Sequence, residues 1–295
     1  MRGSERSGTY GLQFCFFIAY DQKESIERKL SPSIYCPRFE SEENDEGDFL
    51  LKRISRLPNF QGETFWLQTW THKLIAICIL CFLIPLFDST GTVYAWLTFS
   101  NVPRQFLLGV GVFPEIRNGE IWRLVSPVFL HAGPLHLLFN MYWLHQLGHV
   151  VESKIGGRTY LLTVLWVSLL SNVVFYLWIG PHFVGMSGVI YGLLGFLWAY
   201  QKFSPRESRE FDEGTLQFFL LWYMACWLLS AAKILHVANS IHGVGLLAGI
   251  LFALGLAMWQ LRKSSFRVFR QEPLSTWGII LALVAGGLLT DFWVY

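Results

Sequence analysis

Two polar residues in otherwise apolar segments, Ser187 and His242, have the side chains of a nucleophile and its base. A serine hydroxyl is a weak nucleophile until a base removes its proton, and histidine does this near neutral pH. Ser187 lies in the sequence Gly185-Met186-Ser187-Gly188, whose glycines permit a tight turn into a helix. Backbone N–H groups at a helix start are free to stabilise an oxyanion. Taken singly, the serine is also explained as a helix cap, and the histidine as a residue bonded to a carbonyl or lying at a wet boundary.

Glycines follow both residues at helical spacing. His242, Gly245 and Gly249 are spaced i, i+3, i+7 and share one helix face, while Gly188 and Gly192 form a GxxxG pattern. Small residues on facing stripes let two membrane helices pack backbone to backbone. We therefore expect the two segments to pack together and to bring the serine within hydrogen-bond reach of the histidine.

Two further polar residues, His136 and Asn140, are spaced i, i+4 and lie on one face of a third apolar segment. Both side chains can donate hydrogen bonds to a developing negative oxygen. They are therefore the candidates for an oxyanion hole. The alternative for Asn140 is a hydrogen bond that joins two membrane helices.

No Asp or Glu occurs in the apolar segments of Ser187 and His242, so the third member of a catalytic triad is missing from them. Tyr191 lies one turn after the serine and points the same way, where it can stack on the imidazole or bond to it. Asn239 lies one turn before the histidine. One of these two residues is expected to orient the ring.

The composition is that of a membrane protein. Hydrophobic residues make up 53% of the 295 residues and charged residues 15%, whereas a soluble domain carries about a quarter charged residues. The apolar residues form blocks of roughly twenty, the length that crosses a bilayer as a helix. We expect an all-α polytopic fold of six spans, near 66–87, 128–150, 160–179, 185–200, 216–235 and 240–261, with a short seventh near 277–292. The mixed segment 92–123 is expected to lie partly in the membrane interface.

The positive charges predict the orientation of these spans. By the positive-inside rule the basic connections face the cytosol, which also makes the N-terminus cytosolic. Ser187 and His242 then lie at similar depth near the outer face. We expect the plasma (inner) membrane of a bacterium, with membrane lipids around the chain. The basic residues of the three connections are Lys154 and Arg158; Lys202, Arg206 and Arg209; and Arg262, Lys263, Arg267 and Arg270.

The chain divides into a cytosolic region 1–65, a core 66–262, and a basic connection with the seventh span over 263–295. The apolar run Tyr10–Tyr20 is too short to span a bilayer, and no small-residue cleavage site follows it as in a signal peptide. A small cytosolic domain is the preferred interpretation. The net charge of +2 gives no indication of nucleic-acid binding. The five cysteines suggest no disulfide framework.

Several separate motifs, in this order, resemble the rhomboid family of intramembrane serine proteases over residues 66–262. The resemblance implies that a Ser–His dyad hydrolyses single-pass or multi-pass transmembrane substrates without a cofactor. It implies Ser187 as nucleophile, His242 as general base and acid, and an oxyanion hole formed by His136, Asn140 and the Ser187 N–H. It also implies structural roles for Arg123 and Glu152. One departure is Ile241, where the family usually has alanine. The motifs are Trp122-Arg123, His131 with His136 and Asn140, Gly185 to Gly188 with Tyr191, and His242 with Gly245 and Gly249.

Three other classes of protein fit the sequence less well. A soluble serine hydrolase needs GxSxG after a strand, and here Val189 occupies the second glycine position with no strand pattern before it. A metal or haem protein could use His145 and His149, but no third ligand stands out. A catalytically inactive relative that binds membrane clients would typically lack the serine or the histidine, and both are present here.

Overall fold

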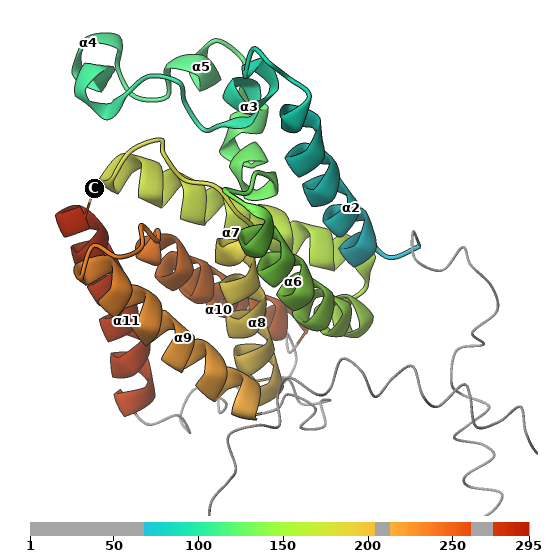
Figure 1. Cartoon of the computed structure of the whole chain (residues 1–295). Helices are drawn as coiled ribbons and strands as arrows, with labels where there is room; N and C mark the ends of the chain where they lie inside the picture. The colour runs from blue at the N-terminus through green and yellow to red at the C-terminus, as the bar shows by residue number, and fades with distance from the viewer. Residues whose placement is uncertain (1–67, 204–212, 261–273, 295) are drawn as a thin grey trace, which may run out of the picture. The chain divides into compact units, whose positions relative to one another are not determined.

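The computed structural model describes residues 68–203, 213–260 and 274–294 (Figure 1), all within the second of two compact units, Gln61–Tyr295. In these ranges the chain is helical and has no strand. The predicted cytosolic region 1–65 and the basic residues Arg206, Arg209 and 262–270 lie outside the described residues. The long helices overlap the expected spans, and they are α2 (Trp70–Leu83), α6 (Pro134–Ile155), α7 (Gly157–Trp178), α8 (Ser187–Phe203), α9 (Glu213–Ala231), α10 (Asn239–Gln260) and α11 (Leu274–Val294).

The predicted membrane fold is confirmed by the helices and by their surface. Three of the described helices, over 157–178, 214–231 and 239–260, are long and apolar enough to cross a membrane. Large apolar side chains lie exposed on the outer faces, such as Leu138 on α6, Leu162 on α7 and Leu221 on α9, which is 72% exposed. A soluble protein avoids such a surface, whereas a bilayer accepts it. α2 and α8, with 14 and 17 residues, are shorter than the roughly twenty residues of a full span.

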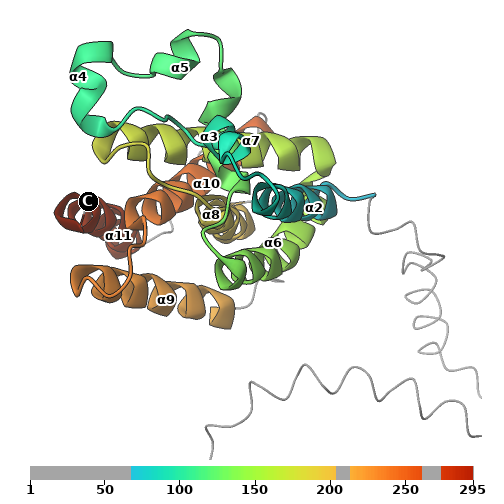
Figure 2. The same ribbon diagram turned by 45° about the horizontal axis from the view of Figure 1, so that its top comes forward.

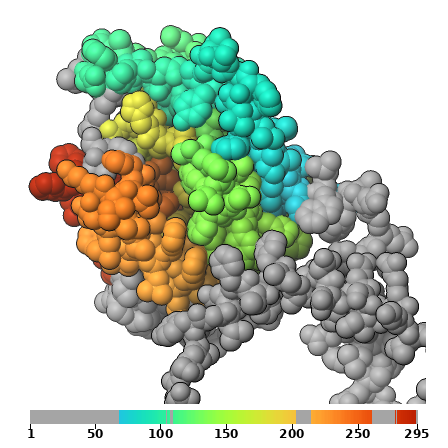
Figure 3. All heavy atoms as spheres, viewed as in Figure 1, coloured from blue at the N-terminus to red at the C-terminus, as the bar shows by residue number. Residues whose placement is uncertain are grey.

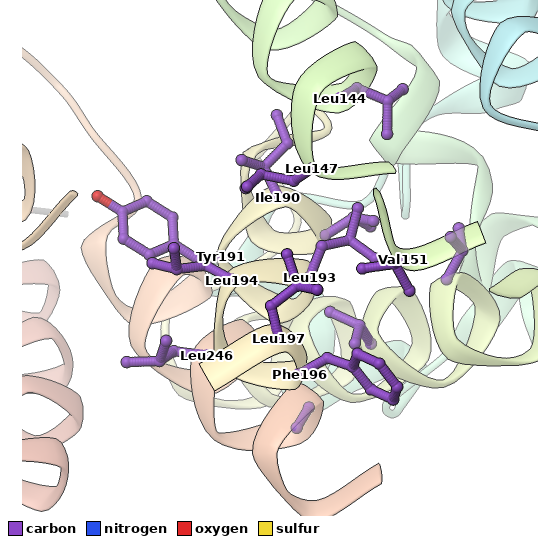
Figure 4. Packing of buried hydrophobic residues seen from close by; sticks show 14 of the residues in the cluster. Leu144, Leu147, Val151, Ile190, Tyr191, Leu193, Leu194, Phe196, Leu197 and Leu246 are labelled. Atoms are coloured by element: carbon purple, nitrogen blue, oxygen red, sulfur yellow. The ribbon is translucent and has the colours of Figure 1, made fainter. Parts of the chain in front are cut away.

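α8 lies at the centre of the bundle, where α6, α7 and α10 surround it (Figure 2). Every residue from Gly188 to Leu197 is buried. A helix that is apolar on all sides belongs in such a position. Figure 4 shows Leu193 and Leu197 of α8 within the core, with Leu144 and Val151 of α6 on one side and Tyr191 on the other. Protein rather than lipid therefore covers α8, which explains how a short helix is tolerated there.

The two glycine stripes meet, as the spacing predicts. A Cβ atom added at Gly249 would lie 2.6 Å from the carbonyl carbon of Gly192, and one at Gly245 would lie 2.9 Å from that of Gly188. Only glycine permits this approach, because the neighbouring atoms are backbone and cannot rotate away. α8 and α10 are consequently the most closely packed pair of helices in the described chain.

The second span begins later than the sequence suggests. Residues Ser126–Phe129 form a short 3-10 helix, and α6 starts only at Pro134 rather than near residue 128. A proline at the first helical position supplies a preset φ and needs no hydrogen bond from its nitrogen. His131, expected at the start of this span, therefore lies in the loop before α6.

The mixed segment 92–123 contains only short helices, among them α3 (Thr92–Leu97), α4 (Leu107–Val110) and α5 (Pro114–Arg117). Arg123 is buried and holds this segment together. Its guanidinium forms an ion pair with Glu120 at 2.6 Å and donates to the carbonyl oxygens of Ala95 and Thr98, both at 2.7 Å.

Glu152, near the end of α6, joins that helix to the start of α2. Its carboxylate accepts hydrogen bonds from the backbone N–H groups of Trp70 at 2.8 Å and Thr71 at 2.9 Å, and from the Thr71 hydroxyl at 2.8 Å. The first N–H groups of a helix lack partners within it, so a carboxylate there stabilises the helix start.

α6 and α9, the green and orange helices on the face seen in Figure 3, contact one another through aromatic rings. The ring centroids of Phe139 and Trp222 are 5.1 Å apart, and those of Trp143 and Phe218 are also 5.1 Å apart. These contacts are apolar, so α9 is held on this side by ring packing.

Candidate active site

The starts of α8 and α10 bring Ser187 and His242 into contact. Ser187 Oγ lies 2.9 Å from His242 Nε2, which is the distance of a hydrogen bond that can transfer a proton. Ser187 is the first residue of α8 and is partly exposed, whereas His242 is buried in the first turn of α10. The glycine contacts between the two helices permit this short separation, because no side chain there holds the backbones apart.

Aromatic rings hold the imidazole in place. The Tyr191 ring stacks on His242 with centroids 4.6 Å apart and an angle of 21°, and the Tyr223 ring meets it edge-on at 6.2 Å. Nδ1 of His242 has no hydrogen-bond partner in the part of the chain that the structure describes. Of the two residues expected to orient the ring, Tyr191 contacts it. The Asn239 amide instead donates to the Ser230 hydroxyl at 3.1 Å.

His136 and Asn140 lie beside the turn that leads to the serine. A Cβ atom added at Gly185 would lie 2.8 Å from Nε2 of His136 and 3.9 Å from Nδ2 of Asn140. The Ala132 N–H donates to Nδ1 of His136 at 3.4 Å. A neutral imidazole that accepts at Nδ1 carries its proton on Nε2, so a hydrogen-bond donor is directed toward the turn.

Position 185 has two requirements that only glycine meets. Its φ of +120° lies in the region that favours glycine, and a side chain there would overlap the His136 ring. Its N–H donates to the carbonyl oxygen of Pro127 at 3.1 Å. The turn before Ser187 is thereby tied to the 3-10 helix Ser126–Phe129, which precedes α6.

Ile241, the departure from the family pattern, packs directly on α8. A Cβ atom added at Gly188 would lie 2.5 Å from Cγ2 of Ile241. The larger side chain is accommodated because the facing position is a glycine, and the 2.9 Å contact between Ser187 and His242 is kept.

Two residues around the histidine carry no motif in the sequence. Tyr223 of α9 contacts both His242 and Tyr191, and an isolated tyrosine in an apolar segment gives no signal. Asp291 of α11 is fully buried and bonds to the start of α10. It could have been noticed, because a carboxylate within an expected span is by default a functional hypothesis.

At the other end of α6, the rings of His72 and His145 lie 5.3 Å apart and those of His145 and His149 lie 6.4 Å apart. Within the described ranges, no group of three or more His, Cys, Asp or Glu residues is arranged to hold a metal ion.

Comparison with known proteins gives a family match across this site. A family model described as the Rhomboid domain matches residues 118–259, which contain Ser187, His242, His136 and Asn140. The Rhomboid protease GlpG of Klebsiella pneumoniae is 30% identical over 230 residues, covering 77% of this chain and 76% of that protein. The protein of the same name from Yersinia pestis is 30% identical over 195 residues, covering 66% of this chain and 64% of the relative. α11 lies outside the range of the family model.

Proposed function

Because this chain belongs to the rhomboid family and is an intramembrane serine protease, we propose that Ser187 and His242 are its catalytic dyad. It acts on membrane proteins, and the proposed reaction is hydrolysis of a peptide bond in a transmembrane segment. The observation that carries the assignment is the 2.9 Å separation of Ser187 Oγ and His242 Nε2.

In the proposed mechanism Ser187 Oγ attacks the carbonyl carbon of the scissile bond while His242 Nε2 takes the hydroxyl proton. The negative oxygen of the tetrahedral intermediate accepts hydrogen bonds from His136, Asn140 and the Ser187 N–H. The imidazolium then gives its proton to the leaving amine, and an acyl-enzyme remains on the serine. Water, deprotonated by His242, hydrolyses the acyl-enzyme and regenerates the hydroxyl.

The ring contacts support a dyad that works without a carboxylate bonded to the imidazole. Tyr191 stacks on His242 over a flat area, which restricts rotation of the ring about its bond to the backbone. A stacked ring electron cloud also attracts the imidazolium that forms when the serine proton is taken. Tyr191 therefore has the orienting role that a hydrogen-bonded carboxylate has in a triad.

The helix directions support cleavage near the outer face of the membrane. His136, Ser187 and His242 all lie in the first turns of α6, α8 and α10. Lys154 and Lys202 lie in the last turns of α6 and α8, so they mark the opposite end of the bundle. If basic residues face the cytosol, the dyad faces the exterior and the N-terminus is cytosolic. The bacterial relatives make a bacterial plasma membrane the proposed location.

The proposed substrates are single-pass or multi-pass proteins whose transmembrane helix unwinds locally. Helical carbonyl groups are already bonded and shielded, so a segment must open before the serine can attack. Small residues at the scissile bond and helix-weakening Gly or Pro beyond it meet this requirement.

The test is cleavage of a reporter with one transmembrane helix by the full chain in lipid vesicles. Ser187→Ala and His242→Ala are each expected to abolish cleavage. Ser168→Ala is the matched serine control, because the Ser168 hydroxyl is buried and donates only within its own helix, to Val164 O at 2.7 Å. The exposed His182 supplies the histidine control, His182→Ala. Cleavage by either dyad variant at the wild-type rate would disprove the assignment, and a wild type that binds the reporter without cutting it would point to an inactive relative.

A further inference from the structure

The C-terminal helix α11 places a buried carboxylate at the start of α10, the helix that carries His242. Asp291 is fully buried. Its Oδ1 accepts a hydrogen bond from the Asn239 N–H at 3.0 Å, and its Oδ2 accepts one from the Ser240 N–H at 2.6 Å and another from the Ser240 hydroxyl. Asn239 and Ser240 are the first two residues of α10, and the N–H groups there have no partner within the helix.

A carboxylate suits this position better than any neutral side chain. All three partners of Asp291 are donors, and an ionised carboxylate is a pure acceptor with two equivalent oxygens. Its negative charge also lies at the positive end of the α10 dipole. An asparagine would present an NH₂ group to at least one N–H donor, so it could satisfy only part of this arrangement.

His242 follows Asn239 by three residues, within the same first turn. Because Nδ1 of His242 has no hydrogen-bond partner among the described residues, the imidazole is positioned by stacking rings and by the backbone of that turn. Whatever fixes this turn therefore fixes Nε2 relative to Ser187 Oγ. Asp291 binds the N–H groups of the two residues that begin the turn.

α11 is itself attached firmly enough to act as a support. The Tyr223 hydroxyl donates to the carbonyl oxygen of Leu283 at 2.7 Å, and the Trp178 indole donates to that of Leu288 at 3.0 Å. A Cβ atom added at Gly287 would lie 2.9 Å from the Asn239 carbonyl oxygen, which indicates backbone-to-backbone packing of α11 on the start of α10. α7, α9 and α11 thus hold one another around the first turn of α10.

We propose that Asp291 is a positioning residue for the reaction, acting on His242 through the first turn of α10. α11 then contributes to catalysis as well as to the packing of the bundle. This inference rests on the proposed role of the Ser187–His242 dyad. It assigns a function to a helix outside the range of the rhomboid family model.

The experiment separates the rate of the chemistry from the amount of folded protein. Full-length wild type, Asp291→Asn and Asp291→Ala are reacted with a fluorophosphonate probe in detergent, and both the rate constant and the final labelled fraction are measured. The rate constant reports serine activation, and the final fraction reports how much protein is folded. Cleavage of the transmembrane reporter gives kcat and KM for the same samples.

Thr290→Val is the matched control on α11. Thr290 is adjacent to Asp291 and buried, but its hydroxyl donates within its own helix, to Gly286 O at 2.7 Å. Ser240→Ala is an intermediate variant, because it removes one of the three donors and keeps both N–H groups. It also keeps the test valid if the Asp291 variants fail to fold.

We expect the Asp291 variants to lower the labelling rate constant and kcat by about 10- to 100-fold, the effect of displacing a catalytic group by about 1 Å. KM and the final labelled fraction should stay close to those of wild type. Ser240→Ala should show a smaller loss of rate, and Thr290→Val none. A lower labelled fraction with an unchanged rate constant would show a purely structural role and overturn the inference. An equal loss of labelling rate in Thr290→Val would also overturn it. An inactive wild type, or an active Ser187→Ala, would instead refute the proposed function itself.

Discussion

Gly249→Ala tests the glycine contact that sets the distance between α8 and α10. The new Cβ would lie 2.6 Å from the carbonyl carbon of Gly192, and its oxygen would be closer still. Ordinary carbon contacts are about 3.5 to 4.0 Å, so the helices must separate by about 1 Å. Overpacking of a core costs about 1 to 3 kcal/mol, and a clash with backbone belongs at the upper end of that range.

The same displacement acts on the dyad, because α8 carries Ser187 and α10 carries His242. A shift of about 1 Å costs on the order of 10²-fold in rate. We therefore expect reporter cleavage to fall by that factor. The midpoint of thermal unfolding in detergent should fall by about 6 to 12 °C, taking about 2 to 4 °C per kcal/mol for a chain of this size.

Gly255→Ala supplies the control on the same helix. A Cβ atom at Gly255 would have no atom within 4 Å, so the substitution should raise stability by about 0.5 to 1 kcal/mol through the helix propensity of alanine. The reasoning would be refuted if Gly249→Ala were as stable and as active as Gly255→Ala.

Four other variants or conditions give expected outcomes. Asn140→Ala should lower kcat by about 10²-fold with little change in KM, as for other oxyanion donors, and unchanged turnover would remove Asn140 from the site. Gly185→Ala should abolish cleavage, because its φ of +120° strains alanine and the new Cβ would lie 2.7 Å from Cε1 of His136; wild-type activity would contradict this geometry. Glu152→Ala removes the carboxylate that accepts hydrogen bonds at the start of α2, so it should lower the unfolding free energy by about 1 to 3 kcal/mol. The rate at which the fluorophosphonate probe labels the folded protein should stay unchanged. An unaltered midpoint of thermal unfolding would argue against this role of Glu152. The pKa of Asp88 lies below its ordinary value, chiefly because the Thr90 hydroxyl donates a hydrogen bond to the carboxylate. The turn from Asp88 to Val93, which this carboxylate holds, should therefore persist as the pH falls through about 4 and open only below that. NMR titration of the carboxyl group measures this pKa, and an ordinary value would contradict the hydrogen bonds.

The helices could be predicted from the sequence because an apolar block of roughly twenty residues can cross a bilayer as a helix, which satisfies its own backbone hydrogen bonds. The approach of α8 to α10 was predictable too, since the glycines after Ser187 and His242 share the helical spacing of a close contact. The start of α6 was predicted wrongly near residue 128, because hydropathy does not respond to Pro127 and Pro134, which divide that block into a 3-10 helix, a loop and a helix.

The hydrogen bonds of Asp291 could not be predicted from the sequence. Its partners are backbone N–H groups at the start of α10, and every residue type except proline carries the same group. No spacing rule connects position 291 with position 239, so only the fold brings them together. Tyr223 is similar, because its contacts with His242 and Tyr191 depend on where α9 lies in the bundle.

The length of α8 has a consequence for how far a substrate must travel. A helix of 17 residues rises about 26 Å at 1.5 Å per residue, whereas the hydrocarbon layer is about 30 Å thick. If Lys202 keeps its charge at the cytosolic boundary, the residue steps from Lys202 to Ser187 rise only about 22.5 Å, so Ser187 lies about 7.5 Å below the opposite boundary, inside the layer. On the proposed role of Ser187, the bond to be cut must reach that depth in an unwound form. With Ser187 as the proposed nucleophile, the number of residues between Ser187 and Lys202 sets the depth in the membrane at which a transmembrane segment is cut.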